Sequence, residues 1–168
     1  DPEAARALLA EAGLAEGFST TLALPPPSYA RRGGEIVASQ LRAVGIDARI
    51  VNMEWAQWLE QVFANKDFGL TIVSHTEPMD IGIYARPDYY FGARDPVVAA
   101  LMEGLASMAD EADRNAVLAA VQERVADRSP NVFLFQLAKT GVADARIEGL
   151  WENAPTQAND MTGVRWTE

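Results

Sequence analysis

Residues 1–73 alternate between strand-like and helix-like hydrophobic patterns. Three short β-favouring runs precede turn or loop signals, at 20–24, 46–51 and 68–73. Between these runs, apolar side chains recur on one helical face in 29–44 and in 55–63. The second of these stripes consists of Trp55, Trp58, Leu59, Val62 and Phe63. The order strand, helix, strand, helix, strand is typical of a parallel sheet with right-handed crossovers.

The carboxyl ends of parallel strands share one edge of the sheet, where ligands usually lie. The loops at this predicted binding edge begin at Pro25, Asn52 and Ser74. The run 68–73 is almost wholly apolar, which predicts a strand that is buried on both faces. The loop 74–94 is polar, rich in aromatic residues and long for an unstructured connection, which indicates a functional segment.

Helix signals also flank the central pattern. The sequence Asp1-Pro2-Glu3 begins a helix that stops near Gly13, and two further helices are predicted over 95–105 and 110–128. The run 132–137 reads as a last core strand, and the tail from 141 to 168 mixes short extended pieces with turns. We therefore expect an α/β fold with a mixed, mostly parallel sheet flanked by helices, in one domain spanning residues 1–168.

Composition narrows the classes of partner and chemistry. The 168 residues carry a formal net charge of −10 and no basic block that could follow a phosphate backbone, so no nucleic-acid partner is expected. The absence of cysteine excludes disulfides, Cys-based metal sites and thiol catalysis. No signal peptide or lipidation motif is visible at Asp1, so the signal of an exported parent would lie outside this chain.

Three candidate ligand-binding residues follow the first two predicted strands. Trp55 opens a helix at the predicted binding edge, where its ring offers a large, stiff stacking surface with one donor. Core packing beside Trp58 is the alternative. Tyr29 and Arg31 follow the proline run near a helix N-terminus, where backbone donors and positive charge suit an anionic group. A solvated arginine is the alternative there.

Further candidates lie in the loop 74–94. We expect His75, Glu77 and Asp80 to line a pocket, and together with Asp88 they also form a possible mixed nitrogen and oxygen metal site. No metal and no cofactor is expected, because the sequence does not set the geometry of these carboxylates. Tyr89 and Tyr90 either stack on a ligand at the mouth of a cleft or seal the loop onto the domain.

Two other classes of function stay open at this stage. A small α/β hydrolase would use His75 with Glu77 or Asp80. Ser74 beside His75 does not form a nucleophile and base pair, because adjacent residues in an extended segment point to opposite faces. Ser74 also lacks the G-x-S-x-G elbow. A stand-alone protein-interaction module is the remaining alternative.

Short motifs in a consistent order point to a known family. They are DPEA at 1–4, LLAEAG at 8–13, QL at 40–41, VGI at 44–46, EW at 54–55 and DF at 67–68, then the run 130–135 and GLW at 149–151. In order and spacing they resemble the C-terminal lobe of family 5 solute-binding proteins, which include peptide-, nickel- and opine-binding members. The resemblance runs over nearly the whole chain.

This resemblance implies a fold and a function. The fold would be one lobe of a type II periplasmic binding protein, with the other lobe absent. The parent would capture a small solute, such as a peptide, opine or sugar, between two lobes and deliver it to an ABC permease. It would be periplasmic or extracytoplasmic, and it would not be an enzyme.

The resemblance also implies roles for individual residues. The tryptophan matching Trp55 lines the ligand cavity of peptide-binding members, and Glu77 or Asp80 would hold the amino group of the ligand. Ile72 and His75 stand where some peptide binders carry an arginine and a tryptophan. The candidate ligand-binding set is therefore Trp55, His75, Glu77, Asp80, Tyr29, Arg31, Tyr89 and Tyr90.

Overall fold

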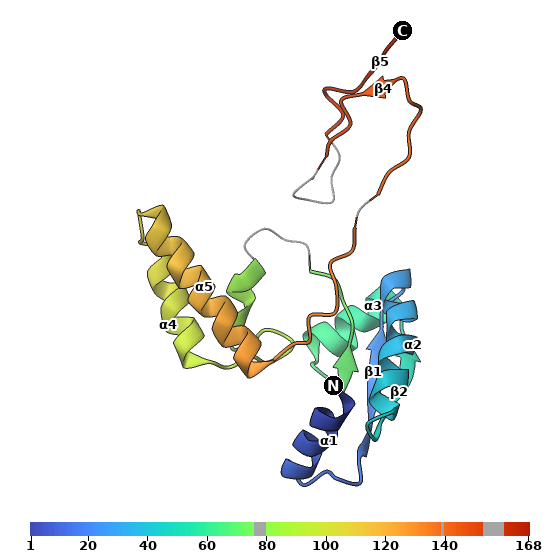
Figure 1. Ribbon diagram of the computed structural model, residues 1–168, viewed down its shortest axis with the longest axis vertical. Helices are drawn as coiled ribbons and strands as arrows, with labels where there is room; N and C mark the ends of the chain where they lie inside the picture. Colours follow the sequence, from blue (N-terminus) through green and yellow to red (C-terminus); the bar gives the residue numbers. More distant parts are fainter. Residues whose placement is uncertain (76–79, 139, 153–159) are drawn as a thin grey trace. The chain divides into compact units, whose positions relative to one another are not determined.

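The computed structural model describes residues 1–75, 80–138, 140–152 and 160–168. The chain folds into two compact units, Asp1–Ser74 and His75–Glu168 (Figure 1). Each unit has its own hydrophobic core. The expectation that residues 1–168 form one lobe of a larger protein stays a prediction.

The first unit contains a three-stranded parallel sheet. The strands are β1 (Phe18–Leu24), β2 (Ile46–Asn52) and β3 (Leu70–Thr71), in the spatial order β2-β1-β3. β1 pairs with β2 in parallel along its whole length, from Phe18 opposite Ile46 to Leu24 opposite Asn52. Because β1 is the central strand, Leu22, Ala23 and Leu24 are buried. The predicted parallel sheet is confirmed.

Helix α2 (Ser28–Arg42) connects β1 to β2 and packs through small residues. Its buried positions are Ala30, Gly34 and Ala38. A Cβ atom on Gly34 would overlap the Leu24 side chain, so a larger residue here would require Leu24 to shift. The predicted helix over 29–44 is confirmed, and it ends as expected before Gly45, whose φ is +98°. Helix α1 (Pro2–Glu11) begins with Asp1 as its N-cap, as its sequence predicts.

The predicted helix over 55–63 is only partly regular. A short α3 (Trp55–Trp58) continues directly into a π-helical turn, η1 (Leu59–Ala64). Of the five residues on the predicted apolar stripe, Trp58 and Val62 are buried, whereas Trp55, Leu59 and Phe63 are exposed. The stripe therefore packs through Trp58 and Val62, while Trp55 keeps the accessibility that its predicted role in ligand contact requires.

The third strand is shorter than the apolar run 68–73 predicts. Only Leu70 and Thr71 pair with β1, opposite Leu22 and Ala23. Ile72 is buried and Thr71 is half-buried, but Leu70 is exposed, so the apolar run is not buried along its whole length as expected. β3 lies at an edge of the described sheet and therefore lacks a neighbour on its outer side.

The second unit is built mainly from helices. A 3-10 turn, η2 (Asp80–Ala85), precedes α4 (Pro96–Leu105) and α5 (Glu111–Arg128), which lie side by side in Figure 1. Val98, Val121 and Val125 form its core together with the half-buried Tyr84 and Met102. Both predicted helices are confirmed. A short antiparallel pair, β4 (Ile147–Glu148) and β5 (Arg165–Trp166), lies in the tail.

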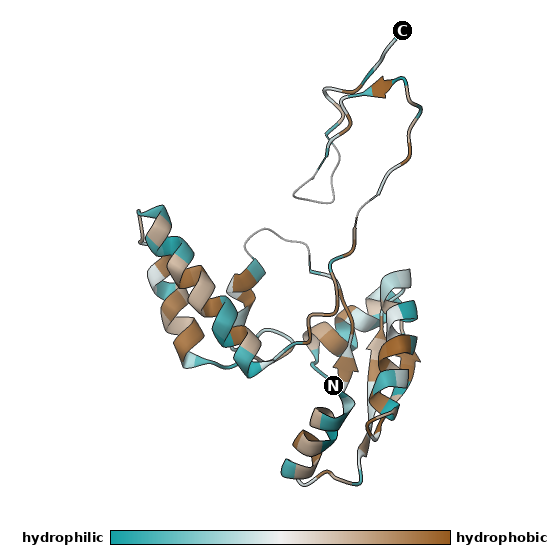
Figure 2. Ribbon diagram, in the orientation of Figure 1, coloured by the Kyte–Doolittle hydropathy of each residue, from teal (hydrophilic) through white to brown (hydrophobic). Residues whose placement is uncertain are grey.

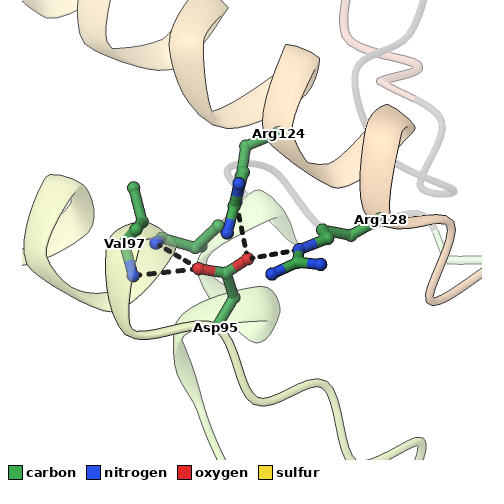
Figure 3. Close-up of polar contacts among 5 residues, drawn as sticks. Asp95, Val97, Arg124 and Arg128 are labelled. Atoms are coloured by element: carbon green, nitrogen blue, oxygen red, sulfur yellow. Dashed lines mark hydrogen bonds and ion pairs between the residues drawn. The ribbon is translucent and has the colours of Figure 1, made fainter.

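Asp95 joins the two helices of this unit (Figure 3). Its Oδ1 caps α4 by accepting hydrogen bonds from the backbone N–H groups of Val97 at 2.9 Å and Val98 at 3.4 Å. Its Oδ2 accepts a hydrogen bond of 2.7 Å from Arg124 Nε, and Arg128 Nε of α5 is 3.6 Å away. The Arg124 hydrogen bond is the main cause that holds the pKa of Asp95 below its usual value.

The predicted core strand over 132–137 is wrong for this chain. None of these residues, all of which the structure describes, belongs to a strand or helix. Figure 2 colours this segment after α5 as mainly hydrophobic, yet Val132 is 78% exposed and Phe133 is 70% exposed. The segment has no strand partner in the described residues, so its apolar pattern does not produce a ladder.

None of the described helices combines the length and apolar character that a membrane crossing requires.

Candidate ligand-binding site

The predicted ligand-binding residues form one cluster in each unit. In the first unit, Tyr29, Arg31 and Trp55 follow the carboxyl ends of β1 and β2, and we call them the edge cluster. In the second unit, His75, Asp80, Tyr89 and Tyr90 come together, and we call them the loop cluster. Glu77 lies outside the described residues.

Local sequence explains why Tyr29 and Arg31 lie at the sheet edge. The run Pro25-Pro26-Pro27 ends β1, because proline has no N–H group to donate to a ladder. α2 begins immediately afterwards, and its N-cap, Pro27, provides no side-chain cap. Tyr29 and Arg31 therefore occupy the first turn of α2, directly after the carboxyl end of the central strand.

Arg31 reaches from α2 to the segment between β2 and α3. Its Nη2 lies 3.4 Å from the carbonyl oxygen of Met53 and 3.2 Å from Glu54 Oε1. The two side chains are substantially exposed, so this ion pair contributes little to the stability of the unit. The pairing directs the guanidinium to the carboxyl end of β2. Arg31 Nε is buried, and none of the described groups accepts its hydrogen bond.

Trp55 and Trp58 have different environments despite their proximity in sequence. Trp58 is only 4% exposed, and its indole N–H donates to Thr71 Oγ1 at 2.9 Å. Trp55 is 41% exposed and meets the ring of Trp58 edge-on, with the ring centroids 5.6 Å apart. Trp58 is therefore part of the packing against the sheet, whereas much of the Trp55 ring remains accessible as a stacking surface.

Tyr29 links the edge cluster to the third strand segment. Its hydroxyl oxygen accepts a hydrogen bond of 2.9 Å from the backbone N–H of Ser74. This hydrogen bond holds the first turn of α2 against Ser74, where the loop after β3 begins. The segments following β1, β2 and β3 thus lie at one edge, as the parallel topology requires.

The loop cluster is organised around His75, the only histidine in the chain. Its Nδ1 lies 2.9 Å from Asp80 Oδ2, and its Nε2 lies 3.2 Å from the hydroxyl oxygen of Tyr90. The imidazole also stacks on the Tyr90 ring, with an interplanar angle of 3°. Asp80 is the first residue of η2, which places its carboxylate beside the histidine.

An aromatic cluster continues from Tyr90. The rings of Tyr89, Tyr90 and Phe91 lie 5.1 to 5.2 Å apart between centroids, and Tyr84 lies 5.4 Å from Phe91. Tyr90 is buried, whereas Tyr89 is half-buried. Burial of Tyr84, and secondarily the charge of Asp80, raises the pKa of the Tyr84 phenol. These rings therefore pack the loop onto its own unit, with part of Tyr89 left accessible.

The metal site and the Ser74–His75 pair that were weighed from the sequence are not found in the described residues, although His75 does contact Asp80. In this part of the chain, no three His, Asp or Glu side chains gather where they could hold a metal ion. Both ring nitrogens of His75 face Asp80 and Tyr90, rather than the hydroxyl of Ser74.

Two contributors to these clusters were not identified from the sequence. Glu54 pairs with Arg31, and Thr71 accepts the indole hydrogen bond of Trp58. The Glu-Trp dipeptide at 54–55 was a possible signal for the first of these residues. The role of Thr71 depends on the register of β3 and has no local sequence signal.

Comparison with known proteins establishes the family. Residues 1–93 match the family described as bacterial extracellular solute-binding proteins, family 5 Middle. This chain belongs to that family. The expected resemblance to family 5 solute-binding proteins is therefore confirmed.

A curated relative and two solved structures define the extent of the similarity. The dipeptide-binding protein of Escherichia coli K12 is 42% identical over 66 residues, which are 36% of this chain and 12% of the relative. The structure of clavulanic acid biosynthesis oligopeptide binding protein 2 matches with a TM-score of 0.84 and 21% identity, over 100% of this chain and 34% of that chain.

The second structure is the dipeptide binding protein from Pseudoalteromonas sp. SM9913 in complex with Met-Leu. It matches with a TM-score of 0.73 and 19% identity, over 99% of this chain and 36% of that chain. These likenesses confirm the α/β fold class, with a parallel sheet flanked by helices. The chain spans about a third of the length of both structures.

Proposed function

We propose that this chain is the part of an extracellular solute-binding protein that provides one side of a binding site for a short peptide. The observation that carries the proposal is the edge cluster, in which Tyr29, Arg31 and Trp55 follow the carboxyl ends of β1 and β2 in a family 5 chain. Peptides are the favoured solute class because the curated relative is named for dipeptide binding.

Each residue of the proposed site has chemistry that suits a peptide. The accessible ring of Trp55 would stack on an apolar side chain or a peptide plane. The Arg31 guanidinium would attract a carboxylate of the ligand. The second unit would have separate roles: Glu77 or Asp80 would hold an amino group, and His75, Tyr89 and Tyr90 would line a pocket. The aromatic side chains would bury the apolar surface of the ligand, and the charged side chains would set its orientation.

The whole protein would capture its solute by a conformational change and would not catalyse a reaction. Two lobes would close over the solute by a hinge motion and present it to an ABC permease, outside the cytoplasm. No bond is made or broken in this function, and no cofactor takes part. Because one lobe supplies only part of the buried contact, this chain alone should bind peptides much more weakly than its parent.

The test is calorimetric titration of the two-lobed parent protein and of this chain with Met-Leu, N-acetyl-Met-Leu and Met-Leu amide. We expect the parent to bind the free dipeptide at least about 10-fold more tightly than this chain does. Blocking the carboxyl terminus should weaken binding to the parent, because the proposed contact of Arg31 needs the ligand's carboxylate. The N-acetylated dipeptide separately tests the proposed contact of an acidic residue with the amino group.

Two tryptophan substitutions in the parent test whether Trp55 itself contacts the peptide or whether the loss of any exposed tryptophan weakens binding. Trp55→Ala should weaken peptide binding about 10-fold or more, on the scale of the area that a large aromatic ring buries. Trp166→Ala removes an exposed tryptophan of the second unit and should leave binding unchanged. Equal effects of the two substitutions, or tight binding of a sugar in place of peptides, would contradict the proposal.

A further inference from the structure

Arg31, the cation of the proposed binding site, already has a negatively charged partner within the chain. Its Nη2 lies 3.2 Å from Glu54 Oε1 and 3.4 Å from the carbonyl oxygen of Met53. Glu54 is the N-cap residue of α3, yet its side chain caps none of the N–H groups of that helix. The carboxylate of Glu54 therefore contacts the guanidinium that the proposed site offers to the carboxylate of a ligand.

The geometry of the Arg31 guanidinium determines which of its N–H groups a ligand can use. An arginine binds a carboxylate most strongly through two parallel N–H groups on one edge of the guanidinium. Nε of Arg31 is buried, so the edge that Nε forms with Nη2 is closed to a ligand. The other edge consists of Nη1 and Nη2. Because Nη2 already donates to two acceptors, a ligand at this edge competes with Met53 or with Glu54.

Glu54 is the partner that a ligand displaces more readily. Met53 is 3% exposed, and its backbone N–H donates to the carbonyl oxygen of Leu24 at 2.9 Å, so its own carbonyl is fixed beside the central strand. The side chain of Glu54 is 80% exposed, and its carboxylate regains full hydration when it leaves Arg31. Exposed ion pairs are weak, so a ligand's carboxylate can take the place of Glu54.

We propose that Glu54 is a specificity-determining residue that competes with the ligand's carboxylate for the Arg31 guanidinium. A peptide with a free carboxyl terminus must break the Arg31–Glu54 ion pair to form its own, which offsets part of its attraction to Arg31. A peptide with a blocked carboxyl terminus leaves the ion pair intact. Glu54 therefore reduces the preference of the site for a free carboxylate. This inference rests on the proposed peptide-binding function, and within it on the contact between Arg31 and the ligand.

The test measures the dissociation constants of Met-Leu and Met-Leu amide for the two-lobed parent protein by calorimetry. The informative quantity is the ratio of the amide's constant to the free dipeptide's constant, because a general effect on folding changes both constants together. Glu54→Gln keeps the size of the side chain and a carbonyl acceptor but removes the charge. We expect this variant to raise the ratio about 2- to 5-fold, the range that an exposed ion pair spans. A purely structural role for Glu54 predicts an unchanged ratio.

Two further variants separate competition for Arg31 from other effects of charge. Glu60→Gln removes the charge of an exposed side chain in η1 that has no described contact with Arg31, and it should leave the ratio unchanged. Arg31→Gln should lower the ratio towards one, and Glu54→Gln should have no further effect in that background. If Glu54 only repelled the ligand's carboxylate, its substitution would still raise the ratio in the absence of Arg31.

The outcomes distinguish this inference from the proposed function on which it rests. A parent that binds neither peptide, or whose ratio does not change in Arg31→Gln, would contradict the proposed contact of Arg31 with the ligand and this inference with it. A ratio that falls in Arg31→Gln but does not rise in Glu54→Gln would overturn the competition alone. An equal rise in Glu54→Gln and Glu60→Gln would also overturn it, because the effect would then come from net charge.

Discussion

The hydroxyl oxygen of Tyr29 accepts a hydrogen bond from the backbone N–H of Ser74 at 2.9 Å. The two residues are 45 positions apart, so this contact joins the first turn of α2 to the segment that follows β3. It also means that Tyr29, a predicted ligand-binding residue, has a second role in holding the sheet edge together. A ligand that meets Tyr29 therefore meets a side chain that is already fixed in place.

Removing the Tyr29 hydroxyl should weaken the attachment of the segment that follows β3 to the first turn of α2. For Tyr29→Phe we expect the free energy of unfolding to fall by about 0.5–1.5 kcal/mol, the usual net contribution of one such bond. Amide hydrogen exchange at Ser74 should also accelerate, while exchange at Leu22 in the central strand stays slow. Unchanged protection of Ser74 would show that this bond does not hold the edge in solution.

Thr71 joins α3 to two strands. Its hydroxyl accepts from the Trp58 indole N–H at 2.9 Å and donates to the carbonyl oxygen of Ala23 at 2.8 Å. Thr71→Val keeps the shape of the side chain but leaves both partners unpaired in a partly buried place. We expect a loss of about 1–3 kcal/mol in urea unfolding. Thr71→Ser retains the hydroxyl and should lose clearly less, and an equal loss in both variants would contradict this role.

The Asp95 network should make the stability of the chain depend on acid pH. Hydrogen bonds from Arg124, Val97 and Val98 hold the pKa of Asp95 below its usual value, with Arg124 as the largest cause. A carboxyl whose pKa is lower in the folded state stabilises that state above the unfolded pKa. This contribution is lost as the pH falls through the lowered value.

The measurement is urea unfolding at pH 7 and at several values below pH 4. Asp95→Asn retains an N-cap for α4 but removes the charge that pairs with Arg124. We expect this variant to be less stable at pH 7, and its stability to fall less steeply on acidification. Asp113→Asn changes an exposed carboxyl in the first turn of α5 and serves as the control. Identical acid profiles for wild type and Asp95→Asn would refute the assignment.

The exposed apolar segment 132–137 should promote self-association of this chain. Phe133 and Phe135 are among its exposed rings, and such runs tend to pair with other exposed backbone or apolar surface. We expect Phe133→Ser with Phe135→Ser to lower the concentration-dependent mass seen by light scattering, with little change in the free energy of unfolding. A large loss of stability in the double variant would instead show that these rings are buried in solution.

Local sequence was sufficient for most of the helices and for the parallel character of the sheet. Asp1-Pro2 and Asp95-Pro96 begin helices where capping predicts them, and Gly45 follows the end of α2. Hydrophobic periodicity also identified the parallel strands. Capping and periodicity are physical effects within a few residues, so they can be read without knowledge of the fold.

Local sequence was not sufficient where strand formation or burial depends on residues that are distant in the sequence. The apolar run 132–137 has the composition of a core strand, but a strand needs a neighbouring ladder, and none of the described residues provides one. The run 55–63 has helical periodicity, but the periodicity does not show that α-helical geometry gives way to a π turn at Leu59 or that Trp55 is exposed while Trp58 is buried. Neither outcome has a signal in the segment itself.

The sequence by itself determined most of the helices, the parallel character of the sheet, the family and the set of residue types available for binding. Only the tertiary structure decided how those residues are used. It buried Trp58 and exposed Trp55, paired Arg31 with Glu54, and placed His75 between Asp80 and Tyr90. The physical reason is that capping and periodicity act over one or two turns of chain, whereas burial and the partner of each polar group depend on segments that only folding brings together.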